Sequence, residues 1–223
     1  MLFVGRKSEK KKIVESLKQG KNIILGGKFG IGRTSIIKEI AKSLADESKF
    51  IFVDFALTPA KMSEKLMKCL ALSVRFKKSS KKMGYKSMRY RIANFETSKT
   101  KQTVIVFDSI AKLTSQKIIF LHHLIEEKHF QFIAIVENFI SSHDLACLKA
   151  LLLPTDVSSL NHLKPDEVVS FLRLYSDKHN LNWSDDYIHD LAVIVKGHPL
   201  SMIEMIRDIK GEIYDRKIRM RFL

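Results

Sequence analysis

The sequence predicts an α/β fold, in which helices cover both faces of a parallel sheet, followed by a small all-helical lid. Short apolar, β-branched runs alternate with longer stretches of helical spacing through most of the chain. The runs are apolar nearly throughout, as is usual for strands that are covered on both faces. After Pro154 the pattern becomes almost wholly helical. This order indicates parallel strands joined by right-handed helical crossovers.

Several segments have the composition of strands, beginning with a run centred on Ile23, Ile24 and Leu25. The predicted strands cover residues 22–27, 50–55, 103–108, 130–136 and 156–160. Apolar side chains at helical spacing predict helices between them. These helices bury Ile36, Ile37, Ile40 and Leu44, cover about residues 59–76, lead towards Phe95, and bury Ile118, Leu121 and Ile125.

Three helices are predicted after the last strand. Pro165 opens the first, because proline fits the first turn of a helix, and the acids beside it favour the positive end of the helix dipole. Ser184 caps the second helix, and Gly197 ends it. Pro199 begins the third. We therefore expect two domains, an α/β core over residues 1–157 and a helical lid over residues 158–223.

The composition is that of a globular protein, with 45% hydrophobic and 28% charged residues. No apolar run approaches the ~20 residues that span a bilayer, and the first residues lack the pattern of a signal peptide. Cys69 and Cys147 fit no framework of disulfides or metal ligands, so we expect buried thiols in a reducing compartment. These features predict a soluble, cytoplasmic protein without a membrane partner.

The formal net charge of +15 is large for 223 residues, and much of it is local. The segment from Arg75 to Lys101 contains ten basic residues and one acid, Glu96. Such a concentration favours a polyanionic partner, because each cation that docks on a phosphate releases condensed counterions. A nucleic acid is therefore a plausible partner of this segment. The alternative is a solvated basic surface with no partner.

A glycine-rich loop after the first strand is the strongest chemical signal in the sequence. It consists of Gly27, Lys28, Phe29, Gly30, Ile31, Gly32, Arg33, Thr34 and Ser35. Except at Arg33, it matches the phosphate-binding pattern Gly-x4-Gly-Lys-Ser/Thr. In that pattern glycines let backbone N–H groups converge on one anion, and the following helix adds the positive end of its dipole. The alternative is a glycine turn with a structural role alone.

Two further residues predict a magnesium site beside the loop. Thr34 would supply a hydroxyl to Mg²⁺, and Asp108 would orient the ion from the end of an apolar strand. The alternative for Asp108 is a residue that caps the next turn. Arg33 stands where the pattern has a lysine; it keeps the charge, but its planar guanidinium is bulkier and differently directed. We expect nucleotide binding to tolerate this change better than catalysis does.

Together these residues resemble the AAA+ and STAND branch of P-loop ATPases, over residues 3 to about 209. The resemblance implies ATP, or ADP, with Mg²⁺ in the glycine-rich loop. It implies that Val4, Gly5 and Arg6 pack near the adenine, and that Asn138 is similar to the sensor-1 residue that reads the γ-phosphate. It also implies that the segment 197–200, through Pro199, reaches back from the lid towards the nucleotide.

Three departures from the family pattern argue against rapid hydrolysis. Arg33 replaces the lysine, and Ser109 stands where the catalytic glutamate usually follows Asp108. Glu137 is the obvious substitute for that glutamate. No arginine lies between Arg91 and Arg173, where the family usually carries an arginine finger. We expect binding with weak or absent turnover.

Two hypotheses about function follow. The first is a nucleotide-dependent switch that assembles on DNA, in replication, transposition or a similar process, through the segment Arg75–Lys101. The second is a STAND-like regulatory or scaffolding pseudo-ATPase whose partner is a protein or a second copy of the chain. A small-molecule kinase is a weaker third, because the sequence shows no region that would bind an acceptor.

Overall fold

A computed structural model describes residues 3–70, 84–95, 101–126 and 129–219 of the protein. The strands are β1 (Asn22–Gly27), β2 (Ser48–Asp54), β3 (Gln102–Ile110), β4 (Phe130–Val136) and β5 (Thr155–Leu160). The helices are α1 (Lys7–Lys18), α2 (Arg33–Ser43), α3 (Pro59–Cys69), α4 (Tyr85–Ala93), α5 (Ser115–Glu126), α6 (Ser142–Leu151), α7 (Pro165–His179), α8 (Asp185–Val195) and α9 (Pro199–Arg219). The predicted α/β fold is confirmed.

Within the described residues the strands form one parallel sheet in the order β2-β3-β4-β1-β5. Successive residues of a strand face opposite sides of the sheet, so each apolar strand contributes to two cores. Ile23 and Leu25 pack with α1 and α2 on one face, whereas Ile24 faces α3, α4, α5 and α6 on the other. Burial of both faces explains why the strands are apolar rather than alternating.

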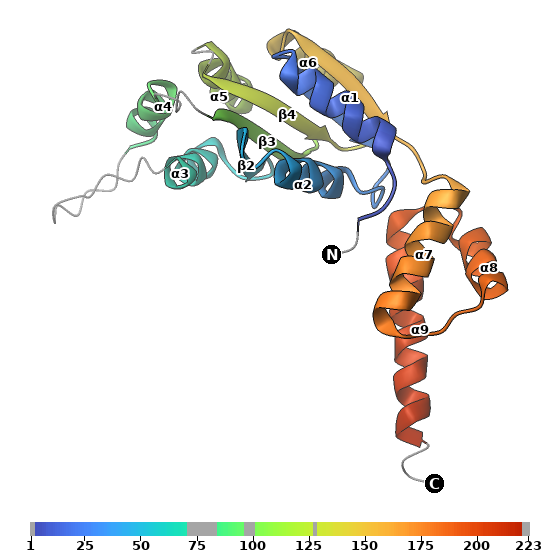
Figure 1. The fold of residues 1–223 in the computed structure, drawn as a ribbon. Helices are drawn as coiled ribbons and strands as arrows, with labels where there is room; N and C mark the ends of the chain where they lie inside the picture. Colours follow the sequence, from blue (N-terminus) through green and yellow to red (C-terminus); the bar gives the residue numbers. More distant parts are fainter. Residues whose placement is uncertain (1–2, 71–83, 96–100, 127–128, 220–223) are drawn as a thin grey trace.

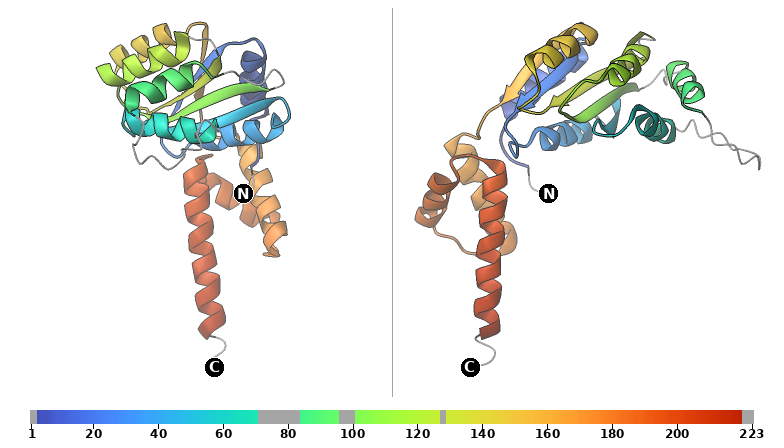
Figure 2. Two further views of the ribbon diagram at one scale, coloured as in Figure 1. Left: turned by 90° about the vertical axis from the view of Figure 1, so that its left-hand side faces the viewer. Right: turned by 180° about the vertical axis from the view of Figure 1, so that it is seen from behind.

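The C-terminal helices form a separate apolar cluster. Val168 and Leu172 of α7, Leu191 of α8, and Met202 and Ile206 of α9 pack together there. Figures 1 and 2 show these helices beside the α/β core, with α9 projecting away from the sheet beyond α7 and α8. The predicted lid helices and their starting residues are confirmed. The division into residues 1–157 and 158–223 stays a prediction, and residue 158 lies inside β5.

Several boundaries differ from the predicted ones. β3 continues past Asp108 to Ile110, with a register shift against β4 between Phe107 and Ile110. Ser109 at this irregularity has a positive φ of 63°. β2 begins at Ser48, earlier than predicted. α3 ends at Cys69, and the rest of the helix predicted to residue 76 lies outside the described residues.

Candidate functional site

The glycine-rich loop joins the end of β1 to the start of α2, as the sequence predicts. Gly30 and Gly32 have φ values of 75° and 92°, in the left-handed region that favours glycine. Gly32 is the N-cap of α2, so the first amides of that helix follow the loop directly. Amides at the start of a helix lack partners within the helix and suit an anion. The loop therefore has the backbone features that phosphate binding needs.

Thr34 and Asp108 lie together at the start of α2 and near the end of β3. The Thr34 hydroxyl donates a 2.9 Å hydrogen bond to Asp108 Oδ2. The other carboxylate oxygen accepts the amide of Ser109, also at 2.9 Å, which fixes the orientation of the carboxylate. Hydroxyl and carboxylate oxygens are the ligands that Mg²⁺ prefers, so this pair fits the predicted metal. The metal role itself stays a prediction.

Arg33, the first residue of α2, turns towards β4. Its Nη2 donates to Glu137 Oε2 at 2.7 Å, and its Nη1 donates to the carbonyl of Val136. The exposed fractions of the Arg33 and Glu137 side chains are 8% and 15%. In this arrangement the positive charge of the loop arginine is compensated by a carboxylate of the protein. The sequence proposed Glu137 as a catalytic base, but here its carboxylate is held by a guanidinium.

Asn138 follows Glu137 at the carboxyl end of the sheet and is exposed. The amide of Glu137 donates to the carbonyl of Ile110 at 2.9 Å, which fixes this turn against the end of β3. Asp54 ends β2 in register with Asp108 on the neighbouring strand. Asn138 is thus placed at the same edge of the sheet as the loop, and its sensor role stays a prediction.

Arg6 links three parts of the molecule, although it precedes the first helix. Its side chain is buried, and Nη2 donates to the carbonyls of Ile31, at 2.9 Å, and Asn161, at 2.8 Å. Its amide donates to Glu167 Oε1 at 2.6 Å. Burial lowers the pKa of the Arg6 guanidinium, and the nearby Glu9 opposes this shift. Arg6 therefore ties the loop to the lid; its predicted contact with adenine stays a prediction, as do those of Val4 and Gly5.

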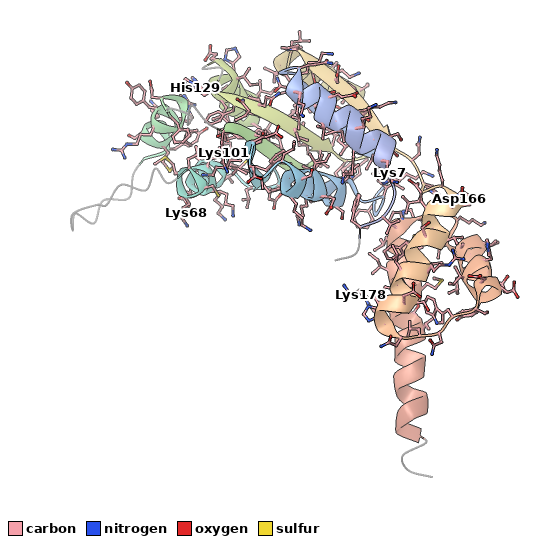
Figure 3. The ribbon with its side chains drawn as sticks, in the orientation of Figure 1. Lys7, Lys68, Lys101, His129, Asp166 and Lys178 are labelled. Atoms are coloured by element: carbon pink, nitrogen blue, oxygen red, sulfur yellow. The ribbon has the colours of Figure 1, made fainter. Side chains whose placement is uncertain are left out.

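The lid contacts the loop directly at the start of α9. His198 Nε2 lies 3.0 Å from the carbonyl oxygen of Phe29. A Cβ on Gly30 would lie 2.7 Å from Leu200 Cβ and 2.9 Å from His198 Cε1. Pro199, predicted to reach the nucleotide, lies between these two lid residues. A change in the conformation of the loop would therefore alter its contacts with the lid. Figure 3 labels Lys7 and Asp166, which lie in the first turns of α1 and α7.

Sequence reasoning missed three residues of this junction. Glu167 was interpreted only as an acid near a helix start, yet it also accepts the Lys164 amide at 2.9 Å and binds Arg6. Asn161 contributes a backbone carbonyl, which no side-chain pattern reveals. His198 belongs to the segment 197–200, but its bond to the loop depends on the packing of elements that are distant in the sequence.

Much of the basic segment Arg75–Lys101 lies outside the described residues. Of its described members, Lys86, Arg91 and Lys101 are exposed. Arg89 is half-buried: its Nη2 lies 2.6 Å from His123 Nε2, and its guanidinium lies over the ring of Tyr85. Arg89 therefore holds α4 against α5, whereas Lys86 and Arg91 are exposed on α4 and Lys101 Nζ donates to the carbonyl of Ala45 at 2.9 Å.

A separate groove of about 340 Å³ lies between α1 and the edge strand β5. Lys12, Ser16, Asp156 and Val157 are among its lining residues, and no residue of the glycine-rich loop lines it. Ser16 donates a 2.7 Å hydrogen bond to Asp156, and chiefly through this bond the pKa of the Asp156 carboxyl lies below its usual value.

Other predictions from the sequence can be compared with the structure. Cys69 and Cys147 are free thiols, but each is half-buried rather than buried, because their helices pack only part of their surface against the sheet. Among the described residues, no group of three or more His, Cys, Asp or Glu is arranged to hold a metal ion. No helix in the described part of the chain has the length and apolar character that crossing a bilayer requires.

The parallel sheet and the glycine-rich loop with its Thr34–Asp108 pair, followed by the helical lid, define a P-loop NTPase fold. More specifically, the chain belongs to the KAP family of P-loop domains, which it matches over residues 7–220. No curated protein sequence is similar enough to this chain to count as a relative.

Three solved proteins illustrate the shared fold. ORC1 from Aeropyrum pernix, solved in complex with DNA, is 16% identical with a TM-score of 0.68, over 97% of this chain and 62% of that one. A lysine-to-arginine mutant of RuvB from Thermotoga maritima is 15% identical with a TM-score of 0.65, over 96% and 65%. ORC2 from Aeropyrum pernix in its ADP form is 12% identical with a TM-score of 0.62, over 92% and 63%. This chain thus spans less than two thirds of each protein, and the similarity establishes the fold alone.

Proposed function

We propose that this chain binds an adenine nucleotide, ATP or ADP, together with Mg²⁺ in the loop from Gly27 to Ser35. The observation that carries the proposal is the 2.9 Å hydrogen bond between Thr34 and Asp108, which places a hydroxyl and a carboxylate side by side where the loop enters α2. A glycine turn with a structural role alone does not require this pair. The lid contact at Phe29 and the left-handed glycines support the same site.

The residues fit the proposed ligands as follows. Amides of the loop and of the first turn of α2 would hold the phosphates, and Thr34 and Asp108 would hold the metal. Bound Mg²⁺ would offset the negative charge of the phosphate oxygens. Asn138 lies at the same edge, where it could contact a terminal phosphate. Val4, Gly5 and Pro199 stand next to Arg6 and His198, the residues that join the loop to the rest of the chain.

We test this binding by calorimetric titration of MgADP and MgATP, with and without a chelator of Mg²⁺. Thr34→Ala should weaken binding in the presence of Mg²⁺ by about tenfold, because it removes one metal ligand. Ser43→Ala is the matched control: it also removes a hydroxyl from α2, one that donates only to the carbonyl of Ile40. Heat from neither nucleotide would contradict the proposal.

The proposed activity is that of a nucleotide-dependent switch. The loop contacts the lid through His198 and Leu200, and Arg6 joins Ile31 of the loop to Asn161, which precedes the lid helices. A phosphate that reorganises the loop would therefore change contacts that hold the lid, and a ligand shifts such an equilibrium by its difference in affinity for the two states.

Weak or absent hydrolysis is part of the proposal. Two features support it: the Glu137 carboxylate is paired with Arg33, and Ser109 follows Asp108. A general base must reach the proton that it removes, and the Glu137 oxygen that accepts the Arg33 hydrogen bond is turned to the guanidinium instead of to a water molecule. Phosphate release by the wild type should stay at the level of an Asp108→Asn variant. A wild-type rate well above that variant would show an active ATPase.

We further propose association with DNA. The net charge of +15 and the exposed Lys86, Arg91 and Lys101 support it, as does the fold shared with ORC1, which was solved with DNA. Lys86→Glu combined with Arg91→Glu should weaken binding to unrelated duplexes, and binding should fall steeply with salt. Lys149→Glu with Lys178→Glu is the matched control, because both lysines are exposed on other helices. If both double variants lose the same affinity for DNA, the segment Arg75–Lys101 has no specific role in binding it.

A protein-binding regulator is the second candidate function. The observation that favours it is the exposure of apolar side chains on α8, where Val193 is 73% and Ile194 is 67% exposed. Neighbouring exposed apolar residues are typical of a protein contact. If the protein does not bind DNA, and Val193→Asp changes the mass of the protein or of its complexes in solution, a protein-binding role replaces the proposed association with DNA.

A further inference from the structure

The ion pair of Arg33 and Glu137 gives the loop an electrostatic property that the P-loop pattern lacks. A P-loop lysine contributes an uncompensated positive charge to the phosphates. Here the guanidinium donates to Glu137 Oε2 at 2.7 Å and to the carbonyl of Val136, so both of its terminal nitrogens already bind acceptors of the protein. The pair as a whole is neutral.

The pair is also largely shielded from solvent. Only 8% of the Arg33 side chain and 15% of the Glu137 side chain are exposed. Separating the two groups would leave a carboxylate without its partner in a region from which water is largely excluded, and such separation is strongly unfavourable. A ligand that recruits Arg33 must therefore compensate for the loss of the pair.

The binding of each phosphate of a nucleotide depends to a different degree on a side-chain cation such as Arg33. The amides of the loop and of the start of α2 can hold one phosphate without any side-chain cation. A third, terminal phosphate adds negative charge beyond those amides. Because the closed pair is neutral, Arg33 offers this added charge little net attraction while it is bound to Glu137.

We propose that the closed Arg33–Glu137 pair makes this site select a nucleoside diphosphate over the triphosphate. The triphosphate binds well only when Arg33 leaves Glu137. This inference rests on the proposed nucleotide site and adds its ligand preference. It assigns Glu137 a role in specificity rather than in proton transfer.

The test is calorimetric titration of MgADP and of a non-hydrolysable MgATP analogue into the wild type, Glu137→Gln and Glu39→Gln. The wild type should bind the diphosphate on the order of tenfold more tightly. Glu137→Gln removes the competing charge, so affinity for the triphosphate should rise about tenfold while affinity for the diphosphate changes little. Glu39→Gln, which removes an exposed pair with Lys42 on the same helix, should behave as the wild type.

The outcomes separate the two proposals. Binding of both nucleotides with equal affinity, or with a preference for the triphosphate, overturns the selectivity while the nucleotide site stands. An equal change of both affinities in Glu137→Gln also overturns it. Binding of neither nucleotide overturns the site and the selectivity together. Thermal melting of each variant checks its folding, and the wild-type comparison decides alone if Glu137→Gln does not fold.

Discussion

The amide of Arg6 donates a 2.6 Å hydrogen bond to the carboxylate of Glu167, across 161 positions of sequence. Arg6 precedes the first helix of the core, and Glu167 lies in the first turn of the lid helix α7. Because the Arg6 side chain also reaches the carbonyl of Ile31, the start of the chain, the glycine-rich loop and the lid share one set of hydrogen bonds. The lid is therefore connected to the loop by more than the chain that joins them.

Replacing Glu167 should weaken this connection. Glu167→Ala leaves the buried amide of Arg6 without its acceptor and removes the cap at Lys164, so the free energy of unfolding should fall by about 1–3 kcal/mol. Denaturant titration gives this value. Asp166→Ala is the control, since it removes a neighbouring acid of the same turn and should cost only about 0.3–1 kcal/mol. Equal losses in the two variants would mean that the bond to Arg6 contributes nothing.

The two left-handed glycines of the loop should respond differently to alanine. Both substitutions strain the backbone by about 1–2 kcal/mol, because each φ is positive. Only Gly30→Ala also collides with the lid, at Leu200 and His198, and this should add about 1–3 kcal/mol. A Cβ on Gly32 meets nothing within 4 Å. If thermal melting shows Gly32→Ala to be the less stable variant, the lid does not pack on the loop.

Removing His198 should loosen the loop without unfolding the core. His198→Ala deletes the contact at 3.0 Å with the carbonyl of Phe29. A hydrogen bond of this kind contributes about 0.5–1.5 kcal/mol, so amides of the loop should exchange with solvent up to about tenfold faster. Hydrogen–deuterium exchange measures the rates, and His189→Ala, an exposed histidine of α8, is the control. Unchanged rates in the loop would refute the contact.

The Ser16–Asp156 hydrogen bond should make stability depend on pH. The bond lowers the pKa of Asp156, so its contribution is present above the ordinary carboxyl pKa of about 3.9 and is lost as pH falls through the lower folded-state pKa. Ser16→Ala should therefore cost up to about 1 kcal/mol at neutral pH and less near pH 2.5, by denaturant titration. Ser43→Ala is the control, because the Ser43 hydroxyl donates to a backbone carbonyl; this variant should lose the same unfolding free energy at both pH values. If the loss of unfolding free energy caused by Ser16→Ala is as large in acid as at neutral pH, the hydrogen bond to Asp156 is not the source of the pH dependence.

The sequence predicted the sheet well because its strands are buried on both faces. Ile23, Ile24 and Leu25 face two different cores, so their run is apolar at every position and stands out from the helices. The extension of β3 to Ile110 was not predicted, because Asp108 and Ser109 are polar and the strand continues through an irregularity. The lid helices were predicted from local signals, since proline and serine mark their starts.

The site was predictable only where chemistry depends on neighbouring residues in the sequence. The loop and Thr34 form one short pattern, and Asp108 lies near the end of β3, which β4 separates from β1. The partners of Arg33 and Arg6 lie 104 and 161 positions away, and only the folded chain brings them together. A guanidinium can bind a phosphate or a carboxylate with the same geometry, so sequence alone does not choose between them.

Hydrogen–deuterium exchange of the wild type, with and without Mg²⁺ and adenine nucleotide, tests the central claim most directly. We predict protection of amides within residues 28–35 and at the lid contact around His198. Protection confined to the groove between α1 and β5, or no change in the loop at saturating nucleotide, would contradict the claim that the glycine-rich loop holds the phosphates.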